Sequence, residues 1–316
     1  MWIGGLKMED VLSFLPGAIA RQIDNLQANI KDKIEEIRIR VNRPLEVAAK
    51  GGPYFLNYIP VESDAEQLIN RLANFSFYTL EEELKKGYIT IEGGHRVGIA
   101  GKVILENGQV KAIRDFSSFN IRIARETIGA ANHIVPYLYN GRWLSAMMIG
   151  APQTGKTTFL RDIARAISTG IPERRIPPLK VGIVDERSEI AGCVRGVPQL
   201  SFGPRVDVLD ACPKAEGMMM LIRSMSPDVL IVDEIGREED AKAIMEAVNA
   251  GIALMMTTHG QTYHDIQKRP ILRNILGLQV FDRYIELKRS SRPGVVSAVR
   301  DGRGTILSNH EGVFHD

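Results

Sequence analysis

The sequence has few cysteines and almost no net charge. Cys193 and Cys212 are the two cysteines among 316 residues, and they lack the C-x-x-C spacing and the second ligand pair of a zinc site. We expect a chain so poor in cysteine to be reduced and cytoplasmic. Lysine and arginine number 40 against 38 aspartate and glutamate, a net charge of +2. Because proteins that bind nucleic acid usually carry a marked basic excess, this balance disfavours nucleic acid as a partner.

Long apolar runs are also missing. No stretch approaches the ~20 apolar residues that a helix needs to cross a bilayer. If the protein acts at a membrane, we therefore expect other proteins to dock it there. Hydrophobic residues make up 44% of the chain and charged residues 25%, an ordinary globular composition that excludes a wholly disordered or fibrous chain.

The length and a change of pattern predict two domains. A chain of 316 residues exceeds what one hydrophobic core usually holds. The pattern changes after about Arg125. We therefore predict a smaller α+β domain over residues 1–125 and an α/β domain over residues 126–316.

Apolar side chains at helical spacing occur in three places of the first domain. They predict a helix over residues 19–30, where Ile19, Ile23, Leu26 and Ile30 recur, and another over residues 68–75. Residues 80–87, LEEELKKG, predict a short helix that Gly87 caps.

Strand patterns occupy the rest of the first domain. Residues 36–41, EIRIRV, alternate apolar and charged side chains, which predicts a half-buried strand with a basic outer face. Residues 88–113 alternate and are rich in glycine, which predicts a hairpin or meander with a turn at residues 106–108. The glycines in this segment lack G-x-G-x-x-G spacing and lead into strands, so they do not predict a dinucleotide site.

Four apolar runs alternate with amphipathic helices in the second domain. The runs are LSAMMI, LKVGIV, VLIV and IALMM, and the helices are predicted over residues 157–168, 218–225 and 241–248. Continuous apolar strands separated by helices predict a mainly parallel sheet that is buried on both faces.

A phosphate-binding loop follows the first of these runs. Residues 150–157, GAPQTGKT, match G-x-x-x-x-G-K-[ST] between an apolar strand and an amphipathic helix, which is the context that the motif requires. Small residues let backbone N–H groups turn towards phosphate oxygens, and the helix N-terminus adds positive potential. We expect Lys156 to reach the β- and γ-phosphates and Thr157 to ligate Mg²⁺. The residues expected to contact the nucleotide are Gly150, Ala151, Pro152, Gln153, Thr154, Gly155, Lys156, Thr157 and Thr158.

Two carboxylates stand at the end of the VLIV run. Asp233 and Glu234 follow residues 229–232, and in open α/β sheets the ligands bind at the carboxyl ends of the strands. We expect Asp233 to hold Mg²⁺ and Glu234 to orient or deprotonate the attacking water. The alternative is a solvated strand end that caps the following helix.

A second acidic cluster follows the LKVGIV run. It contains Asp185, Glu186 and Glu189, and the direction of the sheet aims it at the nucleotide edge. The alternative is a loop charge cluster with no role in the chemistry. We interpret LKVGIV as an extra strand between the phosphate loop and the metal-binding strand, which, with Glu234 beside Asp233, is typical of hydrolytic motors.

A histidine and several arginines complete the set of candidates. The IALMM run leads into Thr257, Thr258 and His259, a polar trio that could sense the γ-phosphate or be structural. His264 is expected on the surface or in a turn. The basic residues in or beside the strands of the first domain are Arg38, Arg40, Arg96, Arg122 and Arg125. They form a solvated sheet face or, for Arg96 and Arg122 above all, contact the nucleotide of a neighbouring subunit.

The order of these motifs resembles a known superfamily. GAPQTGKTT, VDERSE, SPDVLIVDEIG and TTHG match, in sequence, the phosphate loop, acidic box, metal-strand motif and histidine box of the secretion-type motor ATPases. That superfamily drives type II and type IV secretion and pilus assembly. EEIRIRVNRP resembles the opening strand of their N-terminal domain. Within the superfamily, the sequence most resembles the stage III sporulation AA family of spore-forming Firmicutes.

The resemblance implies a fold and a function. It implies a RecA-like phosphate-loop ATPase domain that uses ATP and Mg²⁺, and a hexameric ring at the cytoplasmic face of a membrane complex. The sporulation branch is thought to power a channel between mother cell and forespore, from the mother-cell side, with other stage III membrane proteins as partners.

The resemblance also implies residue roles, with two departures from the superfamily pattern. The acidic-box carboxylate falls on Asp185 or Glu186, the metal-strand glutamate on Glu234 and the histidine on His259. Secretion motors often have glycine where this chain has Asp233, and commonly Glu-Asp where it has Asp185-Glu186. Which of the two acidic pairs supplies the catalytic base therefore stays open.

Two other functions compete with the motor. One is an ATPase that acts on nucleic acid, which the charge balance and the 6% aromatic content disfavour. The other is a nucleotide-gated scaffold with little turnover, which the presence of both Asp233 and Glu234 disfavours.

Overall fold

The computed structural model describes residues 8–49, 52–73, 87–290 and 294–309. The chain divides into two compact units. The first comprises Met1–Glu126 with Gly192–Arg195, and the second comprises Thr127–Ala191 with Gly196–Asp316. Within the described ranges, no helix combines the length and the apolarity that crossing a bilayer takes.

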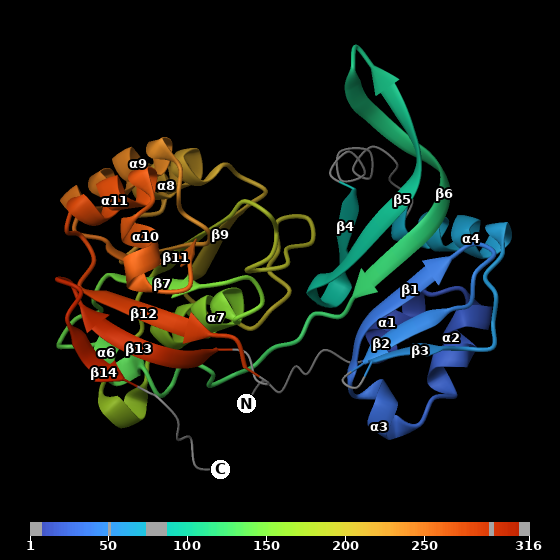
Figure 1. Ribbon diagram of the computed structural model, residues 1–316, viewed down its shortest axis with the longest axis horizontal. Helices are drawn as coiled ribbons and strands as arrows, with labels where there is room; N and C mark the ends of the chain where they lie inside the picture. Colours follow the sequence, from blue (N-terminus) through green and yellow to red (C-terminus); the bar gives the residue numbers. More distant parts are fainter. Residues whose placement is uncertain (1–7, 50–51, 74–86, 291–293, 310–316) are drawn as a thin grey trace. The chain divides into compact units, whose positions relative to one another are not determined.

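The first unit is built on an antiparallel sheet with the strand order β3-β2-β1-β6-β5-β4 (Figure 1). Its strands are β1 (Ile34–Arg40), β2 (Glu46–Ala49), β3 (Gly52–Phe55), β4 (Tyr88–Ile91), β5 (His95–Glu106) and β6 (Gln109–Arg122). Its helices are α1 (Met8–Phe14), α2 (Gly17–Asp24), α3 (Ala28–Lys31) and α4 (Glu62–Ala73). Alternate side chains of β1, Ile37 and Ile39, are fully buried against Ile19, Ile23 and Leu68. The alternating pattern thus forms one buried face, as predicted.

The predicted hairpin is present and the predicted first helix is not continuous. β5 and β6 meet at Asn107 and Gly108, whose φ values of 52° and 76° give the doubly positive geometry of a tight hairpin turn. The helix expected over residues 19–30 is wrong as a single element, because α2 ends at Asp24 and a separate turn, α3, starts at Ala28. Ile19, Ile23 and Leu26 pack in the core of the first unit, whereas α3 has no buried residue, so the apolar spacing does not continue as one buried helix face. The predicted helix over residues 80–87 lies outside the described residues except for Gly87.

The second unit is a mainly parallel sheet with the strand order β14-β13-β12-β7-β11-β10-β8-β9. Its strands are β7 (Ala146–Gly150), β8 (Val181–Asp185), β9 (Val206–Asp210), β10 (Val229–Val232), β11 (Ala253–His259), β12 (Arg283–Lys288), β13 (Val295–Asp301) and β14 (Ile306–Asn309). Strands β12 to β9 pair in parallel, and β13 and β14 add an antiparallel edge. The sequence did not predict β9 or the segment from β12 to β14.

Helices cover this sheet and bury its strands. They are α6 (Val135–Leu138), α7 (Lys156–Thr169), α8 (Lys214–Ser224), α9 (Glu238–Asn249), α10 (Tyr263–Gln267) and α11 (Pro270–Gly277). Figure 1 shows α8, α9 and α11 together over one face of the sheet. Met218 of α8, Ile244 of α9 and Ile275 of α11 share one core with Val232 of β10. Every residue of β7, β8 and β10 is buried, as predicted for a sheet that is covered on both faces.

The strand between the phosphate-loop strand and the metal-binding strand is β11, not β8. β7 pairs with β11, β11 pairs with β10, and β8 lies on the far side of β10. The expectation that LKVGIV occupies the intervening position is therefore wrong. An intervening strand does exist, but it carries His259 at its end and brings that histidine between Lys156 and Glu234. Strand order depends on how the crossover helices pack, so order along the chain could not supply it.

Candidate functional site

The phosphate loop joins the end of β7 to the start of α7. Gly155 has φ of 90°, a left-handed conformation that favours glycine, directly before the first residue of the helix. A Cβ added at Gly150 would collide with Thr154 Oγ1 and lie 3.2 Å from Lys156 Cγ, so the loop closes tightly around this position. Backbone that turns this closely at a helix N-terminus fits a phosphate group.

Lys156 is buried within this loop. The residue is only 6% exposed. Its Nζ donates hydrogen bonds to the carbonyl oxygens of Gly150 at 2.8 Å and Ala151 at 3.1 Å. Burial lowers the pKa of Lys156 from its usual value, while the charges of Asp233 and Glu234 act in the opposite direction. The ammonium group is therefore held at the base of the loop, where a phosphate oxygen can replace the carbonyls as its acceptor.

Asp233 joins the loop to the end of β10. Thr157 Oγ1 donates a hydrogen bond of 2.8 Å to Asp233 Oδ2, and Thr257 Oγ1 donates to Asp233 Oδ1. Thr257, at the end of β11, also accepts from the backbone N–H of Glu234 at 2.9 Å. A hydroxyl and a carboxylate that face each other offer the hard oxygen ligands that Mg²⁺ prefers. Thr157 and Asp233, the predicted metal residues, are thus side by side and fit the ion.

Glu234 lies between two basic side chains. Its Oε1 is 2.7 Å from His259 Nε2, and its Oε2 is 2.8 Å from Arg187 Nη1. Its backbone φ of 54° is unusual for a residue other than glycine. Such strained conformations cluster at functional sites, where the surrounding structure holds them in place.

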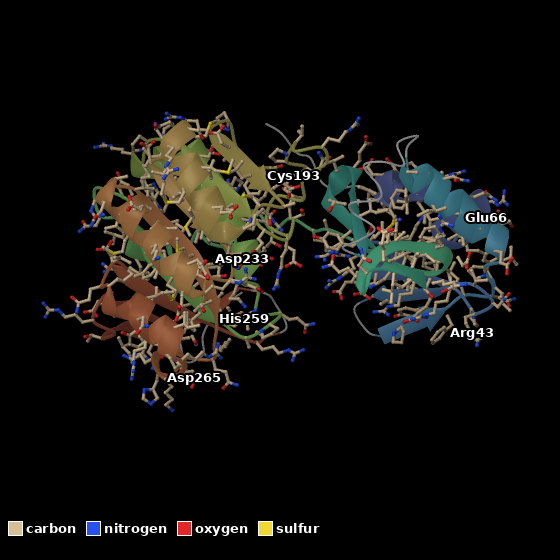
Figure 2. All side chains as sticks on the ribbon, turned by 90° about the horizontal axis from the view of Figure 1, so that it is seen from above. Arg43, Glu66, Cys193, Asp233, His259 and Asp265 are labelled. Carbon is tan, nitrogen blue, oxygen red and sulfur yellow. The ribbon has the colours of Figure 1, made fainter. Side chains whose placement is uncertain are left out.

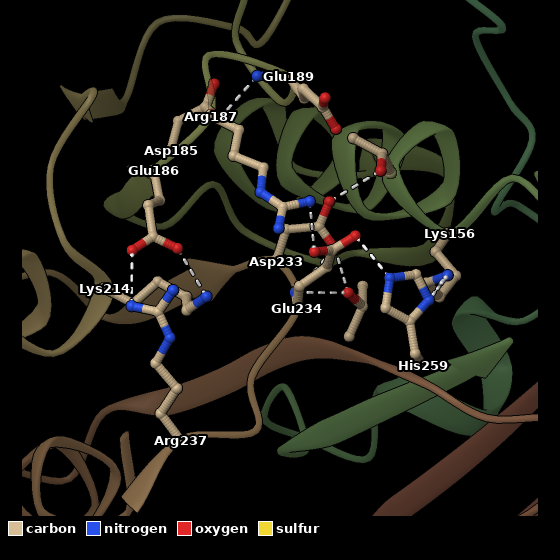
Figure 3. A network of polar contacts seen from close by, with 12 residues as sticks. Lys156, Asp185, Glu186, Arg187, Glu189, Lys214, Asp233, Glu234, Arg237 and His259 are labelled. Carbon is tan, nitrogen blue, oxygen red and sulfur yellow. Dashed lines mark hydrogen bonds and ion pairs between the residues drawn. The ribbon is translucent and has the colours of Figure 1, made fainter. Parts of the chain in front are cut away.

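His259 connects Glu234 to the phosphate loop. Its Nδ1 is 3.2 Å from Lys156 Nζ, and its Nε2 faces Glu234 (Figure 3). Because an ammonium group only donates, Nδ1 acts as the acceptor, which assigns the ring proton to Nε2 and lets it donate to Glu234. Figure 2 shows Asp233 and His259 close together in the second unit. His264, by contrast, is exposed on α10, as predicted for a surface residue.

The two carboxylates of the acidic box have other partners. Asp185 is 2% exposed and accepts backbone N–H groups of Glu189 at 2.9 Å, Ile190 at 2.9 Å and Ala191 at 2.8 Å. Burial raises the pKa of Asp185 to about 6, although these hydrogen bonds oppose the shift. Asp185 therefore organises the loop that follows β8.

Glu186 forms ion pairs away from the phosphate loop. Its Oε2 is 2.7 Å from Lys214 Nζ, and its Oε1 is 3.3 Å from Arg237 Nη1. Burial alone would raise the pKa of Glu186, but the hydrogen bond and charge of Lys214, together with Arg237 and Arg187, lower it below its usual value. The loop after β8 thus contributes Arg187, and not Glu186, to the carboxylate of Glu234.

The candidate arginines of the first unit have local partners. Arg38 and Arg122 approach Glu36 at 3.0 Å and 3.5 Å. Arg40 pairs with Glu46 at 2.6 Å, and Arg125 donates to the carbonyl oxygens of Asp32 and Ile34 at 2.8 Å. The guanidinium of Arg96 lies 3.5 Å from the centre of the Tyr88 ring, and Arg96 is directly opposite Arg122 across β5 and β6. Arg96 and Arg122 thus lie side by side on the sheet.

Sequence reasoning missed two residues of this site, Arg187 and Lys214, and it missed the contact of Thr257 with Asp233. Arg187 and Lys214 stand in loops and helix starts where a basic residue has no distinctive pattern. Thr257 was noted only with its neighbours, as a possible phosphate sensor. Its position one strand away from Asp233 could be found only from the order of the strands.

Comparison with known proteins identifies the family of the chain. The family model described as "Sporulation stage III, protein AA" matches residues 6–307. Stage III sporulation protein AA of Bacillus subtilis (strain 168) is 54% identical over 306 residues, which cover 97% of this chain and 99% of that protein.

Solved structures share the fold at low identity. The Legionella pneumophila ATPase DotB aligns with a TM-score of 0.56 and 16% identity, over 86% of this chain and 76% of DotB. The pilus retraction motor PilT with bound ADP aligns with a TM-score of 0.58 and 15% identity, over 89% of this chain and 80% of PilT. The chain belongs to the stage III sporulation AA family, and its fold is that of these secretion and pilus-motor ATPases.

Proposed function

We propose that the protein is an ATPase that hydrolyses ATP to ADP and phosphate and acts as a motor in a sporulation channel complex. The observation that carries the proposal is the continuous contact from Lys156 through His259 to Glu234. It joins the phosphate loop after β7 to the carboxylate after β10, and so brings a phosphate-binding cation and a general base to one place.

The residues present fit a nucleotide and its metal. The tight loop and Lys156 would hold the β- and γ-phosphates, and Thr157 with Asp233 would hold Mg²⁺. The metal, when bound, would neutralise charge on the phosphate oxygens. Residues 150–158 would then fix the γ-phosphate against the end of β11, where His259 stands.

Glu234 is proposed as the base for the attacking water. Its carboxylate accepts a proton from the water while the water oxygen forms a bond to the γ-phosphorus. The bond from the γ-phosphorus to the bridging oxygen breaks, and that oxygen stays with ADP. His259 orients Glu234 through the 2.7 Å contact and links it to the phosphate that Lys156 binds. Asp185, with three backbone donors on its carboxylate, is proposed as a structural residue instead.

We further propose a homo-oligomeric ring, hexameric by resemblance to the secretion motors, that docks on membrane proteins of a stage III channel complex. Membrane proteins are proposed as docking partners on the same resemblance. Arg96 and Arg122 are the candidates to complete a neighbour's site. A positive charge supplied across an interface can raise turnover by about 10³–10⁵-fold, which would make hydrolysis depend on assembly.

The substitution Lys156→Ala tests the central proposal. We expect ATP binding or turnover to be lost while the circular dichroism spectrum and thermal unfolding stay close to those of the parent. Lys268→Ala is the matched control, because Lys268 is an exposed lysine of the same unit. Unchanged ATP turnover in folded Lys156→Ala protein would remove the proposal.

Turnover at different protein concentrations tests the ring. Activity per subunit should rise with concentration, and Arg96→Ala should lower turnover more than it lowers nucleotide binding. Full activity per subunit in a protein that sediments as a monomer would contradict the trans site and leave the ATPase proposal standing.

A further inference from the structure

A basic cavity adjoins the site on the side of Glu234 and His259. Its volume is about 350 Å³, and its walls include Arg187, Lys214, Arg237 and Arg269 together with Glu234 and His259. Lys156 is not among the lining residues. The cavity is therefore distinct from the phosphate loop, although the two share the Glu234–His259 contact as a boundary.

The charges around this cavity favour an anion. Four basic side chains line it, and Glu234 and Glu186 pair with three of them among the described residues. Counted over these six side chains alone, positive charge exceeds negative charge by two. The first turn of α11 also lines the cavity, which adds the positive end of a helix dipole. An excess of positive potential in a concave site concentrates small anions.

The arginines are able to turn towards such an anion. The side chains of Arg187 and Arg237 are 58% and 64% exposed, so moving a guanidinium within the cavity does not require repacking of the core. Arg269 Nη1 donates a hydrogen bond of 2.7 Å to the backbone carbonyl oxygen of His259, which holds its head group beside that residue. Guanidinium groups bind phosphate oxygens in a forked geometry, which suits a tetrahedral oxyanion.

The position of the cavity relates it to the reaction product. A γ-phosphate bound by Lys156 would face His259 Nδ1, which is 3.2 Å from Lys156 Nζ. The other ring nitrogen of His259 contacts Glu234, which lines the cavity and is paired there with Arg187. One layer of side chains thus separates the cleaved phosphate from the basic cavity, while the loop still holds ADP on the other side.

We propose that this cavity is a second anion site, and that it binds the inorganic phosphate released by hydrolysis. The site itself rests on the geometry above, and its role as the exit for phosphate rests on the proposed ATPase function. If the ion pair between Glu234 and Arg187 broke, phosphate could pass from the phosphate loop into the cavity. There it would bind Arg187, Arg237 and Arg269.

Direct binding of radioactive inorganic phosphate to the full-length protein tests the site. Equilibrium dialysis should detect two classes of phosphate site, one of which Lys156→Ala removes. The double variant Arg237→Gln/Arg269→Gln should keep the loop site and weaken the second by at least about tenfold, the loss expected for charge-assisted hydrogen bonds. Arg273→Gln, which removes an exposed arginine of α11, the helix that follows Arg269, should bind phosphate as the parent does.

Product inhibition of ATP turnover tests the exit role. The double variant should need at least about tenfold more added phosphate for half inhibition. If the double variant fails to fold, each single variant should weaken binding and inhibition by a smaller factor, and Arg269→Lys should retain more of both than Arg269→Gln.

The outcomes separate the two proposals. Suppose that the double variant loses one phosphate site and that the parent protein does not hydrolyse ATP. This result would support the anion site and overturn both the exit role and the ATPase. Normal turnover with phosphate binding unchanged by the arginine substitutions would overturn the second site alone. Binding of phosphate only at the loop would also overturn it.

Discussion

The second unit contains two copies of the same dipeptide with different surroundings. Asp185-Glu186 ends β8 and Asp233-Glu234 ends β10, and these strands are parallel neighbours in which Val184 pairs with Val232. The two aspartates differ first. The carboxylate of Asp185 is bound by three backbone N–H groups, whereas that of Asp233 is bound by the hydroxyls of Thr157 and Thr257 and by one backbone N–H group, that of Glu234. Backbone donors anchor a loop, while movable hydroxyls leave oxygens available to a metal.

The two glutamates differ in the same way. Glu186 is held by Lys214 and Arg237, away from the phosphate loop. Glu234 is held by His259 and Arg187, and His259 touches Lys156. The difference follows from the sheet, because β10 is separated from the loop strand β7 only by β11, and β8 is one strand farther away. Residue type and position at a strand end are equal in the two pairs, so strand order distinguishes them.

The substitution Glu234→Gln should have the largest effect. Loss of a positioned base is expected to lower ATP turnover by about 10²–10⁴-fold. Binding of ATP with Mg²⁺ should persist, because Lys156, Thr157 and Asp233 are unchanged. Steady-state phosphate release and binding of a fluorescent ATP analogue measure the two quantities. If Glu234→Gln hydrolysed ATP normally and a variant of Asp185 or Glu186 did not, the base would be in the acidic box and not at Glu234.

Asp185→Asn should act on stability. An amide that replaces this carboxylate turns an NH₂ group towards backbone N–H donors and leaves buried groups without acceptors. We expect the free energy of unfolding to fall by about 1–3 kcal/mol, measured by urea denaturation. A loss of turnover as large as that of Glu234→Gln, in a variant as stable as the parent, would show that Asp185 acts in the chemistry.

The same aspartate makes stability depend on pH. Its pKa in the folded protein is about 6 against an ordinary value of 3.8, so between these pH values the folded state holds the proton more tightly than the unfolded state. The contribution of Asp185 to the free energy of unfolding should therefore decrease as pH rises through this window, by about 3 kcal/mol in total. The difference in unfolding free energy between the parent and Asp185→Asn, measured at pH 4 and pH 8, isolates it. A difference that is the same at both pH values would contradict the shift.

Local pattern sufficed for the elements of this site but not for their arrangement. The loop over residues 150–158, the buried strands and the polar residues at their ends are encoded by short runs with clear physical meaning. Continuous apolar runs predict strands because both faces of the sheet are covered. The acidic pairs predict ligand-binding edges because parallel strands end at one edge of a sheet.

The rest depends on contacts between segments far apart in the chain. That β11 intervenes between β7 and β10 is decided by helix packing, and it alone brings His259 to Lys156 and Thr257 to Asp233. The edge from β12 to β14 escaped prediction because its strands are not continuous apolar runs: Glu286 lies within β12 and Arg300 within β13. Nothing in the sequence distinguishes Arg187 from other loop arginines. Its contact with Glu234 is seen only in the folded structure.

Glu186→Gln should have the smallest effect and gives the sharpest contrast with Glu234→Gln. The side-chain oxygen of glutamine can still accept from Lys214, which now bonds Glu186 at 2.7 Å, so the cost in stability should stay near about 1 kcal/mol. Turnover should change by less than about tenfold, since this carboxylate is not the proposed base.

Removing the negative charge of Glu186 leaves Lys214 and Arg237 less neutralised, so added phosphate should inhibit turnover at lower concentration than in the parent. Turnover and phosphate inhibition measured on the same preparation check both points. A collapse of turnover in Glu186→Gln with intact nucleotide binding would assign the base to the acidic box and remove the distinction between the two pairs.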